Sequence, residues 1–254
     1  MKIFTHAGAS LSVCLILAAA LTSSAQAGEL QVLAGAGIRA PLNEIAAQFE
    51  KVTGHKVVIR YGTAPELIKM ATTGGPFDLG VCPADVFKDE ATRAQFTSQS
   101  MPEVARIGIG IAVRAGAPKP DISTPEALKQ TLLKSRSIAS IPASATGAYL
   151  ATVYERLGIV EEVRARMRAQ PDPQQIVVAV DKGEAELAVF ILNILTDPRL
   201  DVVGPLPAEL QRETVYSAGV ALGARDAAAV KAFIAYLMSP AGAAVIKAKG
   251  MTPG

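Results

Sequence analysis

Short apolar runs alternate along this chain with stretches of helical spacing, and this alternation limits the fold more than any other feature. Leu30–Ala34 and Lys56–Tyr61 are typical of strands, and each precedes a segment with apolar residues every three or four positions. The same order continues through Asp78–Val81 and a helix expected near 85–96. Strands that alternate with helices in this way predict an α/β protein with mainly parallel sheets flanked by helices.

Two longer β runs, 105–113 and 214–222, interrupt this alternation. They would serve as crossover strands between two lobes, the first made of 28–104 and 223–254 and the second of 105–222. Within the second lobe, 161–169 is expected to form a charged helix. No internal repeat or low-complexity linker separates the halves, so a single continuous sheet stays open as the alternative.

The first 27 residues have the composition of a secretory signal peptide. Lys2 supplies a positive start, an apolar run extends from Leu11 to Leu21, and Ala25-Gln26-Ala27 fits an A-x-A cleavage site. The run is too short to span a membrane, and an N-terminal anchor is the alternative interpretation. Export through such a signal predicts a periplasmic location for residues 28–254.

Charge and cysteine content narrow the function of the exported part. Without Lys2, 24 basic residues face 23 acidic ones, no basic stripe is present and tryptophan is absent, which argues against nucleic acid as a partner. Cys82 is expected to be buried, with a pocket-lining or reactive role as the alternative. No H-E-x-x-H motif, cysteine pair or histidine cluster predicts a metal site, and no cofactor is expected.

Four strand-to-helix junctions are rich in small residues and hydroxyl residues. The N-terminus of a helix offers free N–H groups and partial positive charge, and small residues let an anion approach the backbone. Junctions on both sides of a cleft would line it with amides and hydroxyls. The predicted ligand-binding residues are Ala36, Gly37 and Arg39 in the first junction, Thr63 and Ala64 in the second, Cys82 in the third, and Ser144, Ala145, Thr146, Gly147 and Tyr149 in the fourth.

The first junction also fits the loose dinucleotide fingerprint G-x-G-x-x-A through Gly35, Gly37 and Ala40. Arg60, at the end of the second strand, would suit a 2′-phosphate. Export argues against this interpretation, because NAD(P) is not normally supplied outside the cytoplasm. No acidic residue ends the second strand either, so we interpret the junction as one wall of an anion site.

Four segments, in order and at suitable spacing, carry a family resemblance. They read LQVLAGAGIRAPLNEIAAQFEKVTGHKVVIRYG, GGPFDLGVCPADVF, VDKGEAELAVF and FIAYLMSPAGAAVIKAKGM. Together they resemble the periplasmic molybdate-binding protein family, the extracellular solute-binding proteins of ABC importers. The resemblance implies a two-lobed periplasmic binding protein fold with two crossing strands, a small anion in the cleft, and a membrane permease as partner. Receptors of this kind are typically monomers.

Three places depart from the pattern of that family. Gly37 stands where the family carries a hydroxyl, the hydroxyl of the second turn has moved to Thr63, and the usual tyrosine of lobe two falls near Ile191. Each anion oxygen left without a donor costs roughly 1–3 kcal/mol, so we expect an organic di- or tricarboxylate rather than molybdate. The expected donors are Arg39, Thr63, Ser144 and Thr146.

An enzyme stays open as the alternative function. One type of protein that resembles this family is aconitate isomerase, a periplasmic enzyme that moves a proton along an allylic system in a tricarboxylate. Such chemistry needs a base near the carbon acid and donors for the carboxylates. The candidate proton carriers near the junctions are Glu66, Asp85 and Tyr149, and no spacing singles out one of them.

Overall fold

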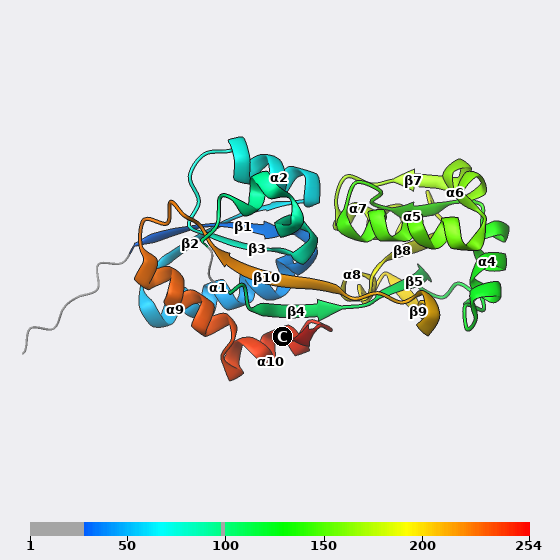
Figure 1. Cartoon of the computed structure of the whole chain (residues 1–254). Helices are drawn as coiled ribbons and strands as arrows, with labels where there is room; N and C mark the ends of the chain where they lie inside the picture. The colour runs from blue at the N-terminus through cyan, green and yellow to red at the C-terminus, as the bar shows by residue number, and fades with distance from the viewer. Residues whose placement is uncertain (1–27, 98–99) are drawn as a thin grey trace, which may run out of the picture.

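The structure, a computed structural model, describes residues 28–97 and 100–254, and the expected signal peptide at 1–27 lies outside the described residues. The described strands form two sheets, one in each half of the molecule (Figure 1). The first sheet has six strands in the order β11-β4-β10-β3-β1-β2, and the second has five in the order β7-β6-β8-β5-β9. The predicted α/β fold with two lobes is therefore confirmed, in place of one continuous sheet.

The first lobe is built on βα units from the start of the described chain. β1 (Glu29–Gly35) pairs in parallel with β2 (Lys56–Gly62) and with β3 (Leu79–Pro83). Neighbouring side chains of β1 enter different apolar clusters, Val32 with α1 and Leu33 with α2, because a strand presents alternate residues to opposite faces. The helices of this lobe are α1 (Arg39–Thr53), α2 (Ala64–Thr73), α3 (Glu90–Arg93), α9 (Ala227–Leu237) and α10 (Pro240–Ala248).

The second lobe has β8 and β5 near the middle of its sheet. Its strands are β5 (Ile109–Arg114), β6 (Ile138–Ser140), β7 (Met167–Ala169), β8 (Leu187–Ile191) and β9 (Leu200–Pro205). Its helices are α4 (Pro125–Lys134), α5 (Ala145–Leu157), α6 (Val160–Arg166), α7 (Pro173–Asp181) and α8 (Leu192–Leu195).

Two helices end earlier than the sequence predicted. The helix expected over 161–169 stops at Arg166, because the next three residues form β7 and pair in parallel with the open edge of β6. The helix expected near 85–96 is a short 3₁₀ turn (Ala84–Lys88) followed by one turn of α3, which Asp89 caps by accepting a bond from the Thr92 N–H.

No single helix in 28–97 and 100–254 has both the length and the hydropathy needed to cross a membrane. Taken together, α9 and α10 meet both criteria, but the pair is bent by 57°.

Both sheets are mixed rather than mainly parallel. In the first, β10 (Thr214–Val220), β4 (Glu103–Ile107) and β11 (Thr252–Pro253) pair antiparallel with their neighbours. In the second, β5 pairs antiparallel with β8 and with β9. Only β10 and β11 in the first sheet and β5 in the second run against the strands of the βα units, whereas β4 and β9 run with them.

The two passages between the lobes are fastened to each other. β4 ends at Ile107 and β5 begins at Ile109, so the first long β run changes sheets at Gly108. The second passage, 206–213, connects β9 to β10. The side-chain amide of Gln211 donates to the Ile109 carbonyl at 2.8 Å and accepts from the Ile109 N–H at 2.9 Å.

Sheet membership bears on where the lobes meet. The sequence placed the changes of lobe at 104/105 and 222/223, whereas most of β4 and all of β10 lie between those bounds and belong to the first sheet. We propose instead that the chain changes lobes at Gly108 and within 206–213, because the strands on either side of these points belong to different sheets.

Asp78 is a buried carboxylate that joins three segments of the first lobe, with a relative exposure of 1%. Its oxygens accept bonds from the N–H of Gln31 at 2.7 Å, the N–H of Arg225 at 2.9 Å and the Arg225 guanidinium at 2.8 Å. Burial acts to raise the pKa of Asp78, but the bonds from Arg225 and Gln31 outweigh it and the pKa lies below its usual value.

We expect Asp78→Asn to lower the free energy of unfolding at neutral pH by roughly 2–3 kcal/mol, because it removes the charge partner of Arg225. Since the folded pKa is depressed, the carboxylate stabilises the fold above its unfolded pKa of about 3.9. That stability is lost as the pH falls through the lower folded pKa. Urea unfolding of both proteins at neutral pH and near pH 3 tests this, and a gap that does not shrink in acid would contradict it.

Candidate functional site

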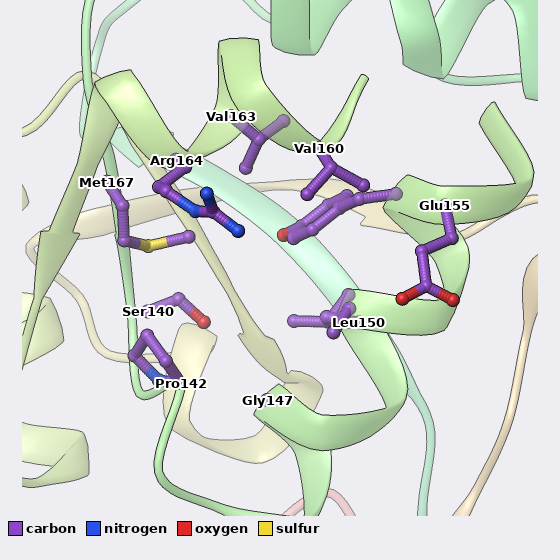
Figure 2. Close-up of a pocket in the computed structure, with 11 residues that line it drawn as sticks. Ser140, Pro142, Gly147, Leu150, Glu155, Val160, Val163, Arg164 and Met167 are labelled. Atoms are coloured by element: carbon purple, nitrogen blue, oxygen red, sulfur yellow. The ribbon is translucent and has the colours of Figure 1, made fainter. Parts of the chain in front are cut away.

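One cavity lies wholly within the second lobe, between α5 and α6 (Figure 2). It has a volume of about 260 Å³, and apolar side chains such as Leu150, Val160 and Met167 form most of its wall. Gly147 lies in this wall, and the cation Arg164 pairs with Glu161 at 2.9 Å. No residue of the first three junctions lines it, so it does not have the composition expected of the anion site.

A second, smaller pocket lies between the lobes and brings three of the predicted junctions together. It has a volume of about 30 Å³, which is room for little more than one carboxylate-sized group. We call it the inner pocket. Its lining residues are Ala36 and Gly37 of the first junction, Gly62 and Thr63 of the second, Ile141, Ser144, Ala145 and Thr146 of the fourth, and Pro173, Phe190 and Tyr216 from elsewhere.

The N-terminus of α5 supplies backbone donors to the inner pocket. Ser144 caps this helix by accepting from the Gly147 N–H at 2.9 Å, and the Ser144 carbonyl accepts from Ala148. The N–H groups of Ala145 and Thr146 are left without a partner inside the helix, as the first turn of a helix requires. Both residues line the pocket, so two amides and the positive end of the helix dipole are available to an anion.

The hydroxyls predicted as donors are mostly engaged elsewhere. Ser144 donates its proton to the Ile141 carbonyl at 2.7 Å. The amide and the hydroxyl of Thr63 both donate to the Glu66 carboxylate, at 2.7 and 2.9 Å. Glu66 therefore takes the place of an anion at the start of α2, in a capping box. Thr146 lies 3.3 Å from the Thr214 hydroxyl, and either oxygen can be the donor of that bond.

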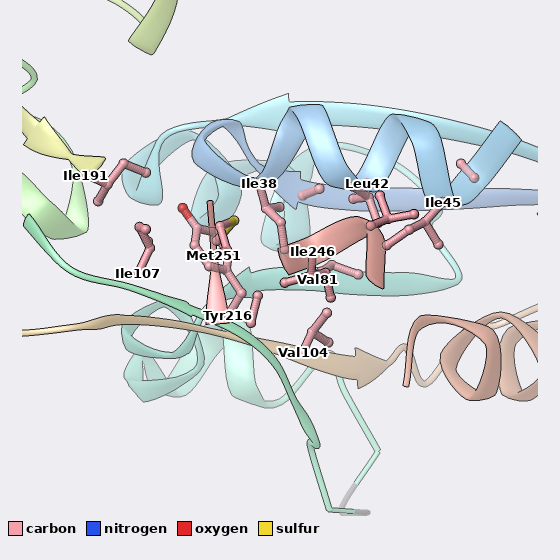
Figure 3. Close-up of a cluster of buried hydrophobic side chains, with 14 of the residues drawn as sticks. Ile38, Leu42, Ile45, Val81, Val104, Ile107, Ile191, Tyr216, Ile246 and Met251 are labelled. Carbon is pink, nitrogen blue, oxygen red and sulfur yellow. The ribbon is translucent and has the colours of Figure 1, made fainter. Parts of the chain in front are cut away.

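Tyr216 contributes a hydroxyl that the sequence analysis missed. It comes from β10, is 3% exposed and lines the inner pocket. Figure 3 shows it in the apolar cluster at the base of the first lobe, with its hydroxyl oxygen on the side of Ile191. Burial raises the pKa of Tyr216, so this group stays neutral and can donate at any physiological pH. A tyrosine in an otherwise apolar β run is the signal that could have revealed it.

A larger chamber shares part of its wall with the inner pocket. Ser144 and Ala145 line both spaces, and the chamber has a volume of about 390 Å³. We call it the outer chamber. Its other lining residues are Ala64, Pro65 and Ile68 from α2, Asp85 and Val86 from the third junction, Pro142, Ala143, Ala148, Tyr149 and Thr152 around α5, and Arg212 from the second passage.

Arg212 is the cation of the outer chamber. Its guanidinium pairs with Asp85 at 2.8 Å and lies over the Tyr149 ring, 5.3 Å from the centroid. Tyr149 donates its hydroxyl proton to the Leu210 carbonyl. Burial acts to raise the pKa of Asp85, but Lys88 and Arg212 outweigh it and keep the pKa below its usual value. Asp85 is therefore ionised at neutral pH and forms ion pairs with Lys88 and Arg212.

Arg39 and Cys82 lie away from both spaces. Arg39 is exposed, with its guanidinium 4.4 Å from the centroid of the Tyr61 ring. Cys82 is 1% exposed and its Sγ lies 3.7 Å from the Leu33 carbonyl, so the predicted burial of this thiol is confirmed. Burial raises its pKa, which makes it an unreactive thiol. Within the part of the chain that the structure describes, no three His, Cys, Asp or Glu side chains gather to hold a metal ion.

The family model for the bacterial extracellular solute-binding proteins matches residues 30–252, and the chain belongs to this family. The chain is 32% identical to an aconitate isomerase of Pseudomonas sp, over 96% of this chain and 95% of the other. It is 28% identical to a molybdate-binding protein of Azotobacter vinelandii, over 91% and 92% of the two chains.

Solved structures share the two-lobed fold. The periplasmic molybdate-binding protein of Azotobacter vinelandii superposes with a TM-score of 0.73 at 21% identity, over 89% of this chain and 99% of that one. The sulfate-binding protein of Mycobacterium tuberculosis superposes with a TM-score of 0.72 at 14% identity, over 89% and 87%. The predicted resemblance to molybdate-binding proteins is thus confirmed at the level of family and fold.

The lobe-two cavity gives a prediction about stability that is independent of the cleft. Tyr154, which lines it, is 7% exposed, and its buried hydroxyl has no hydrogen-bond partner among the described residues. We expect Tyr154→Phe to raise the free energy of unfolding by about 1 kcal/mol, because an unpaired buried hydroxyl is destabilising. Urea unfolding measures this change. A loss of stability would show that the hydroxyl is bonded in solution.

Proposed function

We propose that this protein is a periplasmic receptor that captures an organic di- or tricarboxylate for an ABC importer. The observation that carries the proposal is that Ser144 and Ala145 line both the inner pocket and the outer chamber. A carboxylate in the inner pocket would meet the free amides of Ala145 and Thr146. The rest of the ligand would extend into the chamber toward Arg212. A tetrahedral oxyanion would occupy the inner pocket alone and leave the cation unused.

The supply of donors supports the same choice of ligand. The inner pocket has two free α5 amides and a neutral tyrosine, whereas the hydroxyl protons of Ser144 and Thr63 already have acceptors. An oxyanion with four equivalent oxygens would leave some of them unpaired, at roughly 1–3 kcal/mol for each group. A carboxylate has two oxygens and suits this smaller set. Membership of the solute-binding family supports a membrane permease as the partner that receives the ligand.

Titration calorimetry with tricarballylate, cis-aconitate, trans-aconitate, acetate and molybdate tests the proposal. We expect the tricarboxylates to bind and to raise the melting temperature, and acetate to bind at least tenfold more weakly because it cannot reach Arg212. Binding of molybdate without binding of any carboxylate would refute the proposal.

Three variants examine the role of Arg212. Arg212→Gln is expected to weaken tricarboxylate binding about 10- to 100-fold, since a hydrogen bond to a charged group contributes roughly 1.5–3 kcal/mol. Asp85→Asn removes the same ion pair but keeps the cation, so it should bind as tightly as the wild type or more tightly. Arg168→Gln, an exposed arginine on the edge strand β7, is the matched control. Equal affinity of Arg212→Gln and the control would remove Arg212 from the site.

Isomerisation of a tricarboxylate is the second candidate function, and similarity to an aconitate isomerase favours it. The reaction removes a proton from a methylene carbon, shifts the double bond along the allylic system and returns a proton at the other end. Among the candidate carriers, Glu66 accepts two bonds from Thr63, Asp85 is held by cations, and Tyr149 donates to Leu210. These engagements favour binding over proton transfer.

Incubation with cis-aconitate and with trans-aconitate, followed by proton NMR, decides between the two functions. We expect the free acids to be recovered unchanged from the receptor. Interconversion that is lost in Glu66→Gln would establish the isomerase and identify its base, because glutamine keeps the size of the side chain but cannot accept the proton.

A further inference from the structure

The backbone at Gly35 and at Gly37 passes so close to Tyr216 that neither position has room for a side chain. A Cβ added at Gly35 would lie 2.8 Å from Cε1 of Tyr216, and one added at Gly37 would lie within van der Waals overlap of the Tyr216 hydroxyl. Neither glycine has a positive φ, so backbone conformation does not explain their presence. Tyr216 fills this space together with Pro83 at Gly35 and Ile191 at Gly37, which accounts for the G-x-G pattern without a nucleotide.

The position of the hydroxyl follows from this packing. The oxygen of Tyr216 occupies the place where a side chain at position 37 would begin, and Ile191 closes the same place from the second lobe. The inner pocket holds no charged side chain among its lining residues. No residue that the structure describes forms a hydrogen bond with the Tyr216 hydroxyl, and the side chain lines the pocket. Its proton is therefore available to an anion there.

We propose that Tyr216 is the hydroxyl donor of the inner pocket, and that the residues at positions 35, 37 and 216 together determine which anion is accepted. The inference rests on the proposed function in that the anion is a carboxylate. The tyrosine donates one hydrogen bond to a carboxylate oxygen, and the α5 amides donate to the same group. Any side chain at position 37 would displace the tyrosine oxygen. The pocket can therefore hold either a side chain at position 37 or the Tyr216 hydroxyl in its present place.

The direct test is the tricarboxylate affinity of Tyr216→Phe, which removes one oxygen and keeps the ring. We expect the dissociation constant to rise 10- to 100-fold for the ligand that the wild type binds best. Tyr154→Phe is the matched control, since it removes the hydroxyl of another buried tyrosine, outside the cleft, and should leave the affinity unchanged. An affinity of Tyr216→Phe within twofold of the wild type would overturn the inference while the proposed function stood.

A double-mutant cycle tests the steric half of the inference without any ligand. Gly37→Ser should lower the melting temperature by several degrees because the new side chain collides with the Tyr216 hydroxyl. In combination with Tyr216→Phe the same change should cost much less, because Cζ of Tyr216 lies 3.6 Å from the added Cβ and Cδ1 of Ile191 can rotate away. Additive effects of the two substitutions would show that positions 37 and 216 do not share the space.

The outcomes separate this inference from the proposed function. If the wild type binds molybdate and no carboxylate, the proposed function fails, and a weaker molybdate affinity of Tyr216→Phe would still support Tyr216 as the donor. If carboxylates bind and Tyr216→Phe binds them equally, the inference alone fails. A wild type that binds neither class of anion would overturn both.

Discussion

The paired bonds between Gln211 and Ile109 hold the two passages together at the point where the chain changes lobes. Each sheet is completed by strands that continue from those passages, so the position of one lobe relative to the other depends on this contact. Ile109 is buried, its N–H donates to the side chain of Gln211, and its carbonyl accepts from Gln211 and from the Leu206 N–H. β10 leaves the same region and carries Tyr216 under the first junction. The passage that Gln211 fastens and the strand that brings Tyr216 to the inner pocket are thus consecutive parts of the chain.

Several hydrogen-bond donors near the cleft already have acceptors within the protein. Capping uses the amide of Gly147 and the hydroxyl of Ser144 at one helix, and the amide and hydroxyl of Thr63 at another. Helix termini need these bonds for their own stability. The donors that these caps leave free include the first two amides of α5 and the tyrosine hydroxyl. A group that is bonded in a helix cap is not free to bond a ligand. The proposed site therefore offers fewer donors than its number of polar residues indicates.

Much of the fold followed from pattern, because hydrophobic periodicity and small residues before helices report local structure directly. The first, second and fourth junctions do meet at the inner pocket, and Asp85 of the third reaches the outer chamber. The pattern could not show that β7 would continue from a helix, since pairing with β6 is a long-range contact. The pattern did not single out Tyr216 of β10 or Arg212 of the second passage, because their approach to the cleft depends on long-range contacts. A glycine in the sequence shows that space is available, but not which distant side chain fills it.

Three contacts of the described residues lie at the cleft. Asn193 of the second lobe donates to the Gly37 carbonyl at 2.9 Å, Thr146 of the second lobe bonds with Thr214 of β10 at 3.3 Å, and Asp85 pairs with Arg212 in the wall of the outer chamber. The side-chain oxygen Oδ1 of Asn193 is buried without a partner among the described residues, so the amide of Asn193 is only half satisfied. Any motion that separates the two lobes has to break these contacts. The dwell time of a ligand held between the lobes would therefore depend on the frequency of that motion as well as on the strength of the anion bonds.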